Sequence, residues 1–157
     1  MDLNDWGGRS ALIKAAIRGD TETARALLEA GADSNEKDWG DRTALMEAAT
    51  YGHAELLQLL LDHGADIEAV DLYGQTALIR ASMESNRDCM QILLTRGANT
   101  NAKDKHKMRA LDYAVLYNRT AATEMLLAAM GLDVEQYVQI SQSAGRTTLQ
   151  KEADTTE

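Results

Sequence analysis

The chain of 157 residues contains no proline, no phenylalanine and a single cysteine. One cysteine cannot form an intramolecular disulfide, so a secreted scaffold held by disulfides is excluded. Residues 1–20 hold no apolar leader, and no run approaches the roughly 18 apolar residues of a membrane span. We therefore expect a cytoplasmic protein with no membrane partner.

Motifs for catalysis or cofactor binding are also missing. The three histidines, His53, His63 and His106, are not joined by cysteines or carboxylates at metal-ligand spacing. The chain has no Gly-rich phosphate loop and no Gly-x-Ser-x-Gly motif. Cys89 aligns with Leu56 on a predicted helix, which favours a buried apolar side chain over a nucleophile. These absences predict a protein that is not an enzyme and holds neither a cofactor nor a metal.

Basic residues are in the minority, with 16 Lys and Arg against 25 Asp and Glu, a net charge of -9. Binding of DNA or RNA requires a dominant positive field, so nucleic acid is excluded as the main partner. Aromatic residues are few, two Trp and five Tyr. Ala and Leu supply most of the apolar mass, which is typical of thin, closely packed helices.

The strongest feature present is a 33-residue period. At this spacing the sequence repeats one aspartate and one leucine near the start of each of four units, and one glycine near the end of three of them. These residues are Asp5, Asp38, Asp71, Asp104, Leu12, Leu45, Leu78, Leu111, Gly31, Gly64 and Gly97. A fixed period of this length indicates one supersecondary unit stacked on copies of itself.

The second unit shows the local structure that the period predicts. Thr43 is a helix N-cap candidate, and apolar residues at helical spacing continue to about Tyr51. Gly52 interrupts the pattern, and a second helix is predicted from about Ala54 until Gly64 ends it. The predicted core face of that helix consists of Leu56, Leu57, Leu60 and Leu61. Helices this short are not stable alone, so each unit must be covered by its neighbour.

The unit resembles the ankyrin repeat. The resemblance rests on Asp-x-x-Gly-x-Thr-x-Leu at residues 71–78 and on Gly-Ala-Asp/Asn at residues 31–33, 64–66 and 97–99. The chain has the motif Thr-Ala-Leu where the ankyrin repeat has Thr-Pro-Leu-His, and this motif is similar to that of many bacterial ankyrin proteins. The resemblance implies an all-α solenoid of stacked helix-turn-helix units with hairpin-loop tips.

The repeats define the domain boundaries. We predict repeats at 4–36, 37–69, 70–102 and 103–131, a degenerate C-terminal cap at 132–150 and a disordered tail at 151–157. The fourth unit departs most, with Lys107 at the position of Gly74, as expected of a terminal repeat. Residues 145–149 weakly resemble the start of a unit, but they lie five residues later than the 33-residue period predicts.

The resemblance to ankyrin repeats implies a partner surface made of the hairpin tips and the concave face of the first helices. Six of the seven aromatic residues fall on these positions, Tyr113 among them. Aromatic and Arg side chains outside a core are typical of interface hot spots, although such rings also pack against neighbouring loops. The predicted partner-binding residues are Trp6, Arg9, Arg18, Trp39, Arg42, Tyr51, Tyr73, Lys105 and Tyr117.

Charge also follows the repeat. The series Lys14, Glu47, Arg80 and Tyr113 alternates in sign, which favours salt bridges between repeats over a strip for a partner. The tips are basic and the second helices acidic. The tip cations are Arg9, Lys37, Arg42, Lys103, Lys105, Lys107 and Arg109. This edge either docks against an acidic protein surface or is a solvated loop.

Together these features predict a protein–protein interaction module that is a monomer when free. We expect it to bind a folded protein partner carrying an acidic rim around an apolar patch, as an inhibitor or immunity-type protein does. One alternative is an adaptor or scaffold that self-associates through Met108, Leu116 and Met130 of the fourth unit. Another is a small-molecule-binding or enzymatic protein that uses the concave groove.

Overall fold

A computed structural model describes residues 8–139 of the chain. Its helices are α1 (Ala11–Arg18), α2 (Thr21–Glu29), α3 (Ala44–Tyr51), α4 (Ala54–Asp62), α5 (Ala77–Met83), α6 (Arg87–Thr95), α7 (Ala110–Leu116) and α8 (Thr120–Ala129). A further helical stretch covers 134–139, and the described part contains no strand. Residues 140–157, which include the predicted tail and much of the predicted cap, lie outside the described residues.

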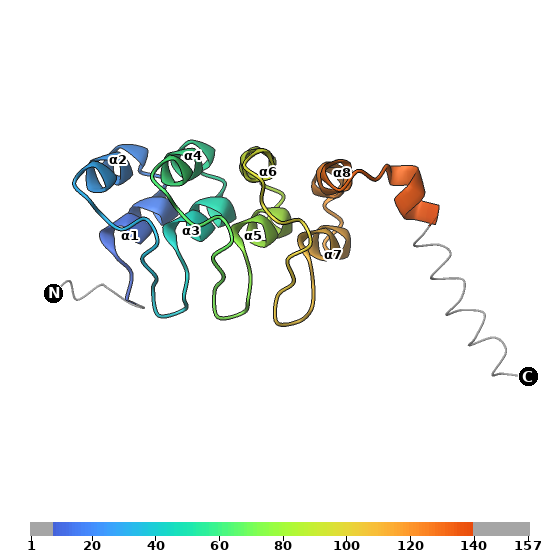
Figure 1. Ribbon diagram of the computed structural model, residues 1–157, viewed down its shortest axis with the longest axis horizontal. Coiled ribbons are helices and arrows are strands. Elements are labelled where there is room, and N and C mark those ends of the chain that lie inside the picture. Colours follow the sequence, from blue (N-terminus) through green and yellow to red (C-terminus); the bar gives the residue numbers. More distant parts are fainter. Residues whose placement is uncertain (1–7, 140–157) are drawn as a thin grey trace, which may run out of the picture.

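The helices form two layers that run along the stack (Figure 1). The first helices of the units pack on one another in the order α1, α3, α5, α7, and the second helices pack in the order α2, α4, α6, α8. The long loops between units project together from one side of the stack (Figure 1). The predicted all-α solenoid of stacked helix pairs is confirmed.

Three of the first helices begin in the same way. The hydroxyl oxygens of Ser10, Thr43 and Thr76 accept a hydrogen bond from the backbone N–H three residues later, at distances of 3.2, 3.4 and 3.3 Å. These bonds satisfy N–H groups that have no partner within the helix. In the fourth unit Arg109 has this position, and its own N–H donates to Asp112 Oδ2 at 2.8 Å.

The first helices end where the backbone turns left-handed. Gly19 and Gly52 have φ of 74° and 76° at the ends of α1 and α3, while Ser85 and Asn118 take φ of 56° at the equivalent positions. At Gly19 a Cβ would lie 2.6 Å from the ring of His53, so glycine supplies space as well as conformation.

The second helices are tied back to the preceding unit by side chains at one repeat position. His53 Nε2 lies 3.2 Å from the carbonyl oxygen of Ile17. Asn86 Nδ2 donates to Ala49 O at 2.7 Å, and Arg119 Nε donates to the carbonyl oxygen of Met83 at 3.0 Å. These carbonyls at helix C-termini lack partners within their helix. The same orphan groups therefore join successive repeats.

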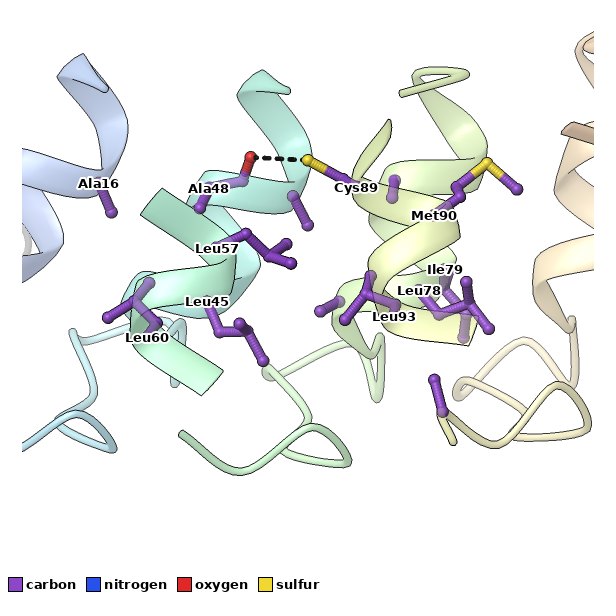
Figure 2. Close-up of a cluster of buried hydrophobic side chains, with 14 of the residues drawn as sticks. Ala16, Leu45, Ala48, Leu57, Leu60, Leu78, Ile79, Cys89, Met90 and Leu93 are labelled. Atoms are coloured by element: carbon purple, nitrogen blue, oxygen red, sulfur yellow. Dashed lines mark hydrogen bonds between the residues drawn. The ribbon is translucent and has the colours of Figure 1, made fainter. Parts of the chain in front are cut away.

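The core runs through the middle of the stack without a break (Figure 2). Leu45, Leu57 and Leu78 are buried there, and each packs between the layers. On α4, Leu59 is buried and Leu61 only partly so, which corrects the predicted core face of this helix. The spacing of apolar residues does not distinguish these two leucines, because only the packing of the neighbouring helices decides which of them is covered.

Cys89 is fully buried in this core, as the sequence predicts. Its Sγ lies 3.7 Å from the carbonyl oxygen of Ala48 in the preceding unit (Figure 2). Burial, with a smaller contribution from Asp88, raises the pKa of the thiol to about 11. The thiol therefore stays protonated at neutral pH and packs as a small apolar group.

Candidate partner-binding surface

The loop aspartates build the hairpin tips. One carboxylate oxygen of Asp38 accepts the backbone N–H groups of Gly40 and Arg42, at 2.8 and 2.9 Å. Asp71 and Asp104 accept the N–H groups two and four residues later in the same way. All three aspartates are buried. Each therefore closes its own tip, which is the physical reason for the 33-residue period of Asp.

The second carboxylate oxygen of each aspartate takes a different donor. Arg80 Nη2 donates to Asp71 Oδ2 at 2.7 Å, and the Tyr113 hydroxyl donates to Asp104 Oδ2. Both donors lie nine residues after their aspartate, at the same repeat position. In the second unit that position is Glu47, which Asp38 repels. Arg42 lies between the two acids, with its Nε 3.1 Å from Asp38 Oδ2 and 3.5 Å from Glu47 Oε1.

These contacts correct two predictions. Arg80 and Tyr113 bind the loop aspartate of their own repeat, rather than forming salt bridges from one repeat to the next. The prediction that Tyr113 lies on the partner surface is also wrong, because this residue is only 6% exposed. Its burial, together with the hydrogen bond to Asp104, raises the pKa of its hydroxyl to about 12. Tyr113 is therefore a core residue that supports the fourth tip.

Backbone hydrogen bonds join one tip to the next. The N–H of Leu72 donates to Gly40 O at 3.0 Å, and the N–H of Lys105 donates to Tyr73 O at 2.9 Å. The tips of the second, third and fourth units consequently lie side by side along the edge of the stack (Figure 1). We call Trp39, Leu72, Tyr73 and Lys105 the tip ridge.

The tip ridge exposes large apolar side chains. Trp39 is 77%, Tyr73 62% and Leu72 49% exposed. Trp39 lies against the preceding tip, because a Cβ on Gly8 would be 2.3 Å from its indole nitrogen. The structure thus brings three predicted contacts, Trp39, Tyr73 and Lys105, onto one continuous edge.

The other predicted contacts lie elsewhere or are engaged internally. Arg9 Nε is 3.9 Å from Asp38 Oδ2, and Arg42 is held as described above, so both side chains are about two-thirds buried. Tyr51 ends α3, Arg18 ends α1 and Tyr117 follows α7; all three are exposed. Because α5 packs between α3 and α7, Tyr51 and Tyr117 do not form one patch. Trp6 lies outside the described residues.

Comparison with known protein families identifies the type of repeat that forms this stack. The family model described as ankyrin repeats (3 copies) matches residues 1–71 and again residues 68–137. The chain belongs to the ankyrin repeat family. No curated protein matches the sequence. Ankyrin repeats are generally protein–protein interaction modules and are typically not enzymes.

The ankyrin register identifies a surface residue that the sequence analysis misses. Leu72 follows its loop aspartate just as Trp39 follows Asp38, and both are exposed at the tip. The predicted contacts are aromatic or basic residues, and this choice leaves the leucine out. Its position 33 residues after Trp39 is enough to find it. Glu47 is buried, and its Oε1 lies 3.5 Å from Arg42 Nε of the same repeat.

Charge is distributed unevenly over this ankyrin stack. The exposed lysines of the described residues lie at the tips, namely Lys37, Lys103, Lys105 and Lys107, while two exposed arginines, Arg25 and Arg87, lie on the second helices. Exposed acids occur on the second helices, namely Glu22, Glu29, Glu55, Asp62 and Asp88. Within residues 8–139 no group of three or more His, Cys, Asp or Glu side chains could hold a metal ion, and no helix is long and apolar enough to cross a membrane. The exposed charge is therefore mainly positive at the tips and mainly negative on the second helices.

The Asp104–Tyr113 pair gives the fold an acid-sensitive contribution. Burial of Asp104 opposes its ionisation, but hydrogen bonds from Tyr113, Met108 and His106 outweigh burial and lower the pKa of the carboxyl. The unfolded value is about 3.9. Ionised Asp104 therefore stabilises the fold above about pH 4, and this contribution is lost as pH falls through the lower folded pKa.

We expect the free energy of unfolding to fall more steeply between pH 6 and pH 2.5 in the wild type than in Asp104→Asn. Urea denaturation at a series of pH values measures this slope. Tyr113→Phe keeps the carboxylate but removes one hydrogen bond, and should give an intermediate slope. Parallel curves for wild type and Asp104→Asn would show that the pair does not act in this way.

Proposed function

We propose that the protein binds a folded protein partner through the tip ridge and the adjoining concave face, and that this binding is its activity. The observation that carries the proposal is the row of exposed apolar side chains at tips whose backbones are fixed. Trp39, Leu72 and Tyr73 lie in loops closed by buried aspartates and joined by backbone hydrogen bonds. Because these hydrogen bonds fix the loop backbone before binding, less backbone entropy is lost on binding, which favours affinity.

The charge around the ridge supports a partner with an acidic rim around an apolar patch. Lys105, His106 and Lys107 are exposed at the fourth tip, next to Tyr73. The exposed acids of the second helices repel an acidic partner from that side of the stack. Opposite charge at the tips would thus orient the partner during encounter, while the rings supply the binding energy.

The test begins with capture from a lysate of the organism that encodes the protein. Wild type is compared with the double variant Trp39→Ala/Tyr73→Ala and with Gln58→Ala/Gln91→Ala, a control pair at exposed positions on the second helices. A protein retained by the wild type and control but lost by the ridge variant is then purified. We expect about 30-fold weaker binding or more per ring removed, since an interface hot spot is worth at least about 2 kcal/mol.

The charge component is measured on the same purified pair. Lys105→Glu and Lys107→Glu should slow association and make it less dependent on salt, because rim charges act mainly on encounter. All variants must first show the wild-type circular dichroism spectrum. If the ridge variant binds as tightly as the wild type, the interface lies elsewhere and the proposal fails.

A further inference from the structure

A groove of about 360 Å³ lies between α6 and α8, which are neighbours in the layer of second helices (Figure 1). This layer lies on the side of the stack opposite the tips, so the groove belongs to a different surface from the tip ridge (Figure 1). Its volume falls within the range of roughly 300–1,000 Å³ that is typical of binding pockets. Its lining includes Arg87 and Asp88 of α6, and Ala121, Glu124 and Met125 of α8.

The groove lies where the fourth unit carries a small side chain in place of an acid. Ala121 has a repeat position that carries an exposed acid in the other three units, namely Glu22, Glu55 and Asp88. A methyl group fills less space between two helices than a carboxylate side chain does, so the surface is hollowed beside Ala121. Met125 packs partly against the core and gives the groove an apolar wall. The groove therefore combines an apolar surface with the charged side chains around it.

The charged side chains of the groove leave it net negative. Asp88 and Glu124 are exposed, and neither carboxylate forms an ion pair with another residue of the described part of the chain. Arg87 lines the groove beside them, so two carboxylates accompany one guanidinium. The exposed Glu55 on the neighbouring α4 adds to the negative potential. A positively charged group is therefore favoured at this groove, and an anion is not.

A lysine or arginine side chain has the chemistry that suits this groove. Both carry a charged head on an apolar stem, which they bury along apolar surface while the head stays in water. The stem would lie along Ala121 and Met125. The head would then reach the carboxylates of Asp88 and Glu124. A second basic residue of an extended segment would also meet Glu55, because packed helices lie about 8–10 Å apart and about three extended residues span that distance. A basic segment therefore fits this surface better than a single small cation.

We propose that this groove is a docking site for an extended basic segment of another protein, and that one lysine or arginine of the segment occupies it. A second copy of this chain is the weaker candidate, because two chains of net charge -9 repel each other at long range. The inference is independent of the proposed function, since the groove and the tip ridge lie on opposite sides of the stack. Together, the two surfaces would let one molecule hold two partners of opposite charge.

The test follows the backbone amide signals of the nitrogen-15-labelled full chain by NMR, at low salt, as a peptide is added. The probe is the acetylated and amidated tetrapeptide Arg-Ala-Arg-Ala, and a matched peptide carries citrulline, which has nearly the same shape as arginine but no charge. We expect the signals of residues around Asp88 and Ala121 to move with the arginine peptide and to stay in place with the citrulline peptide. If the arginine peptide moves none of them, the proposal fails.

Matched variants separate the groove from the overall negative charge of the protein. Asp88→Asn/Glu124→Gln removes the two carboxylates of the groove, whereas Glu22→Gln/Glu29→Gln removes the same charge from α2 at the far end of the stack. We expect the groove pair to weaken binding about fivefold or more, the effect of two surface ion pairs, and the α2 pair to weaken it less than about twofold. Equal weakening by both pairs would show that the peptide follows the general charge, and would overturn the proposal.

A third variant changes the shape of the groove without changing its charge. Ala121→Leu should weaken binding because the larger side chain occupies the place of the stem, and wild-type affinity in this variant would contradict the proposal. The groove signals of the free protein should also be independent of its concentration. Shifts on dilution would assign the groove to the basic fourth tip of a second copy, and would overturn the proposal as well. A wild-type circular dichroism spectrum confirms that each variant is folded.

Discussion

Asp71→Ala is expected to lower the free energy of unfolding by about 3–5 kcal/mol, the range for breaking a buried ion pair by removing one partner. The substitution leaves the N–H groups of Tyr73 and Gln75 without their acceptor, and it leaves the mostly buried guanidinium of Arg80 without its carboxylate. Urea denaturation followed by circular dichroism measures the change. The dependence of the unfolding free energy on urea concentration should be the same in wild type and variant.

Two variants separate the causes of this effect. Asp71→Asn keeps an acceptor oxygen for the loop but removes the charge that faces Arg80, so it should be less harmful than alanine. Asp66→Ala is the matched control, because Asp66 also accepts an N–H two residues later but is exposed. That control should cost no more than about 1 kcal/mol. If Asp66→Ala and Asp71→Ala are equally harmful, burial of the aspartate is not the reason for its importance.

Leu57→Ala should lower the free energy of unfolding by about 2–5 kcal/mol, as expected for a leucine removed from a tightly packed core. Leu57 is fully buried on α4, between the two helix layers (Figure 2). The cavity would open in an inner unit, where neighbours on both sides fix the surrounding side chains. Relaxation into the space is therefore limited, and the cost should fall in the upper part of the range.

The comparison with Leu61→Ala makes this prediction specific. Leu61 lies on the same helix but is only partly buried, so its removal should cost clearly less than that of Leu57. Chemical denaturation of both variants under one set of conditions gives the difference. The sequence pattern groups the two leucines on one face, and equal costs would support that grouping against the packing seen in the structure.

The sequence by itself determined the repeating architecture, because the signals that specify it are local and recur with the 33-residue period. Thr43 marks a helix start by accepting an N–H three residues away, and Gly52 marks its end through a left-handed backbone. Both effects act within one turn of helix and need no knowledge of distant residues. The exposure of Trp39 and Tyr73 followed from the same register, since their loop position was already fixed.

The tertiary structure alone decided how the charged and aromatic side chains are used. Arg80 and Tyr113 reach a loop aspartate nine residues earlier, and Arg42 bridges Asp38 and Glu47. These choices depend on how the tip folds back over the first helix, and the same repeat position holds Glu47, Arg80 or Tyr113. The spacing of a charged or aromatic residue in the sequence does not show whether its side chain lies on the surface or in a buried pair. Desolvation and the distance to a partner decide between them, and both are set by the packing of whole repeats.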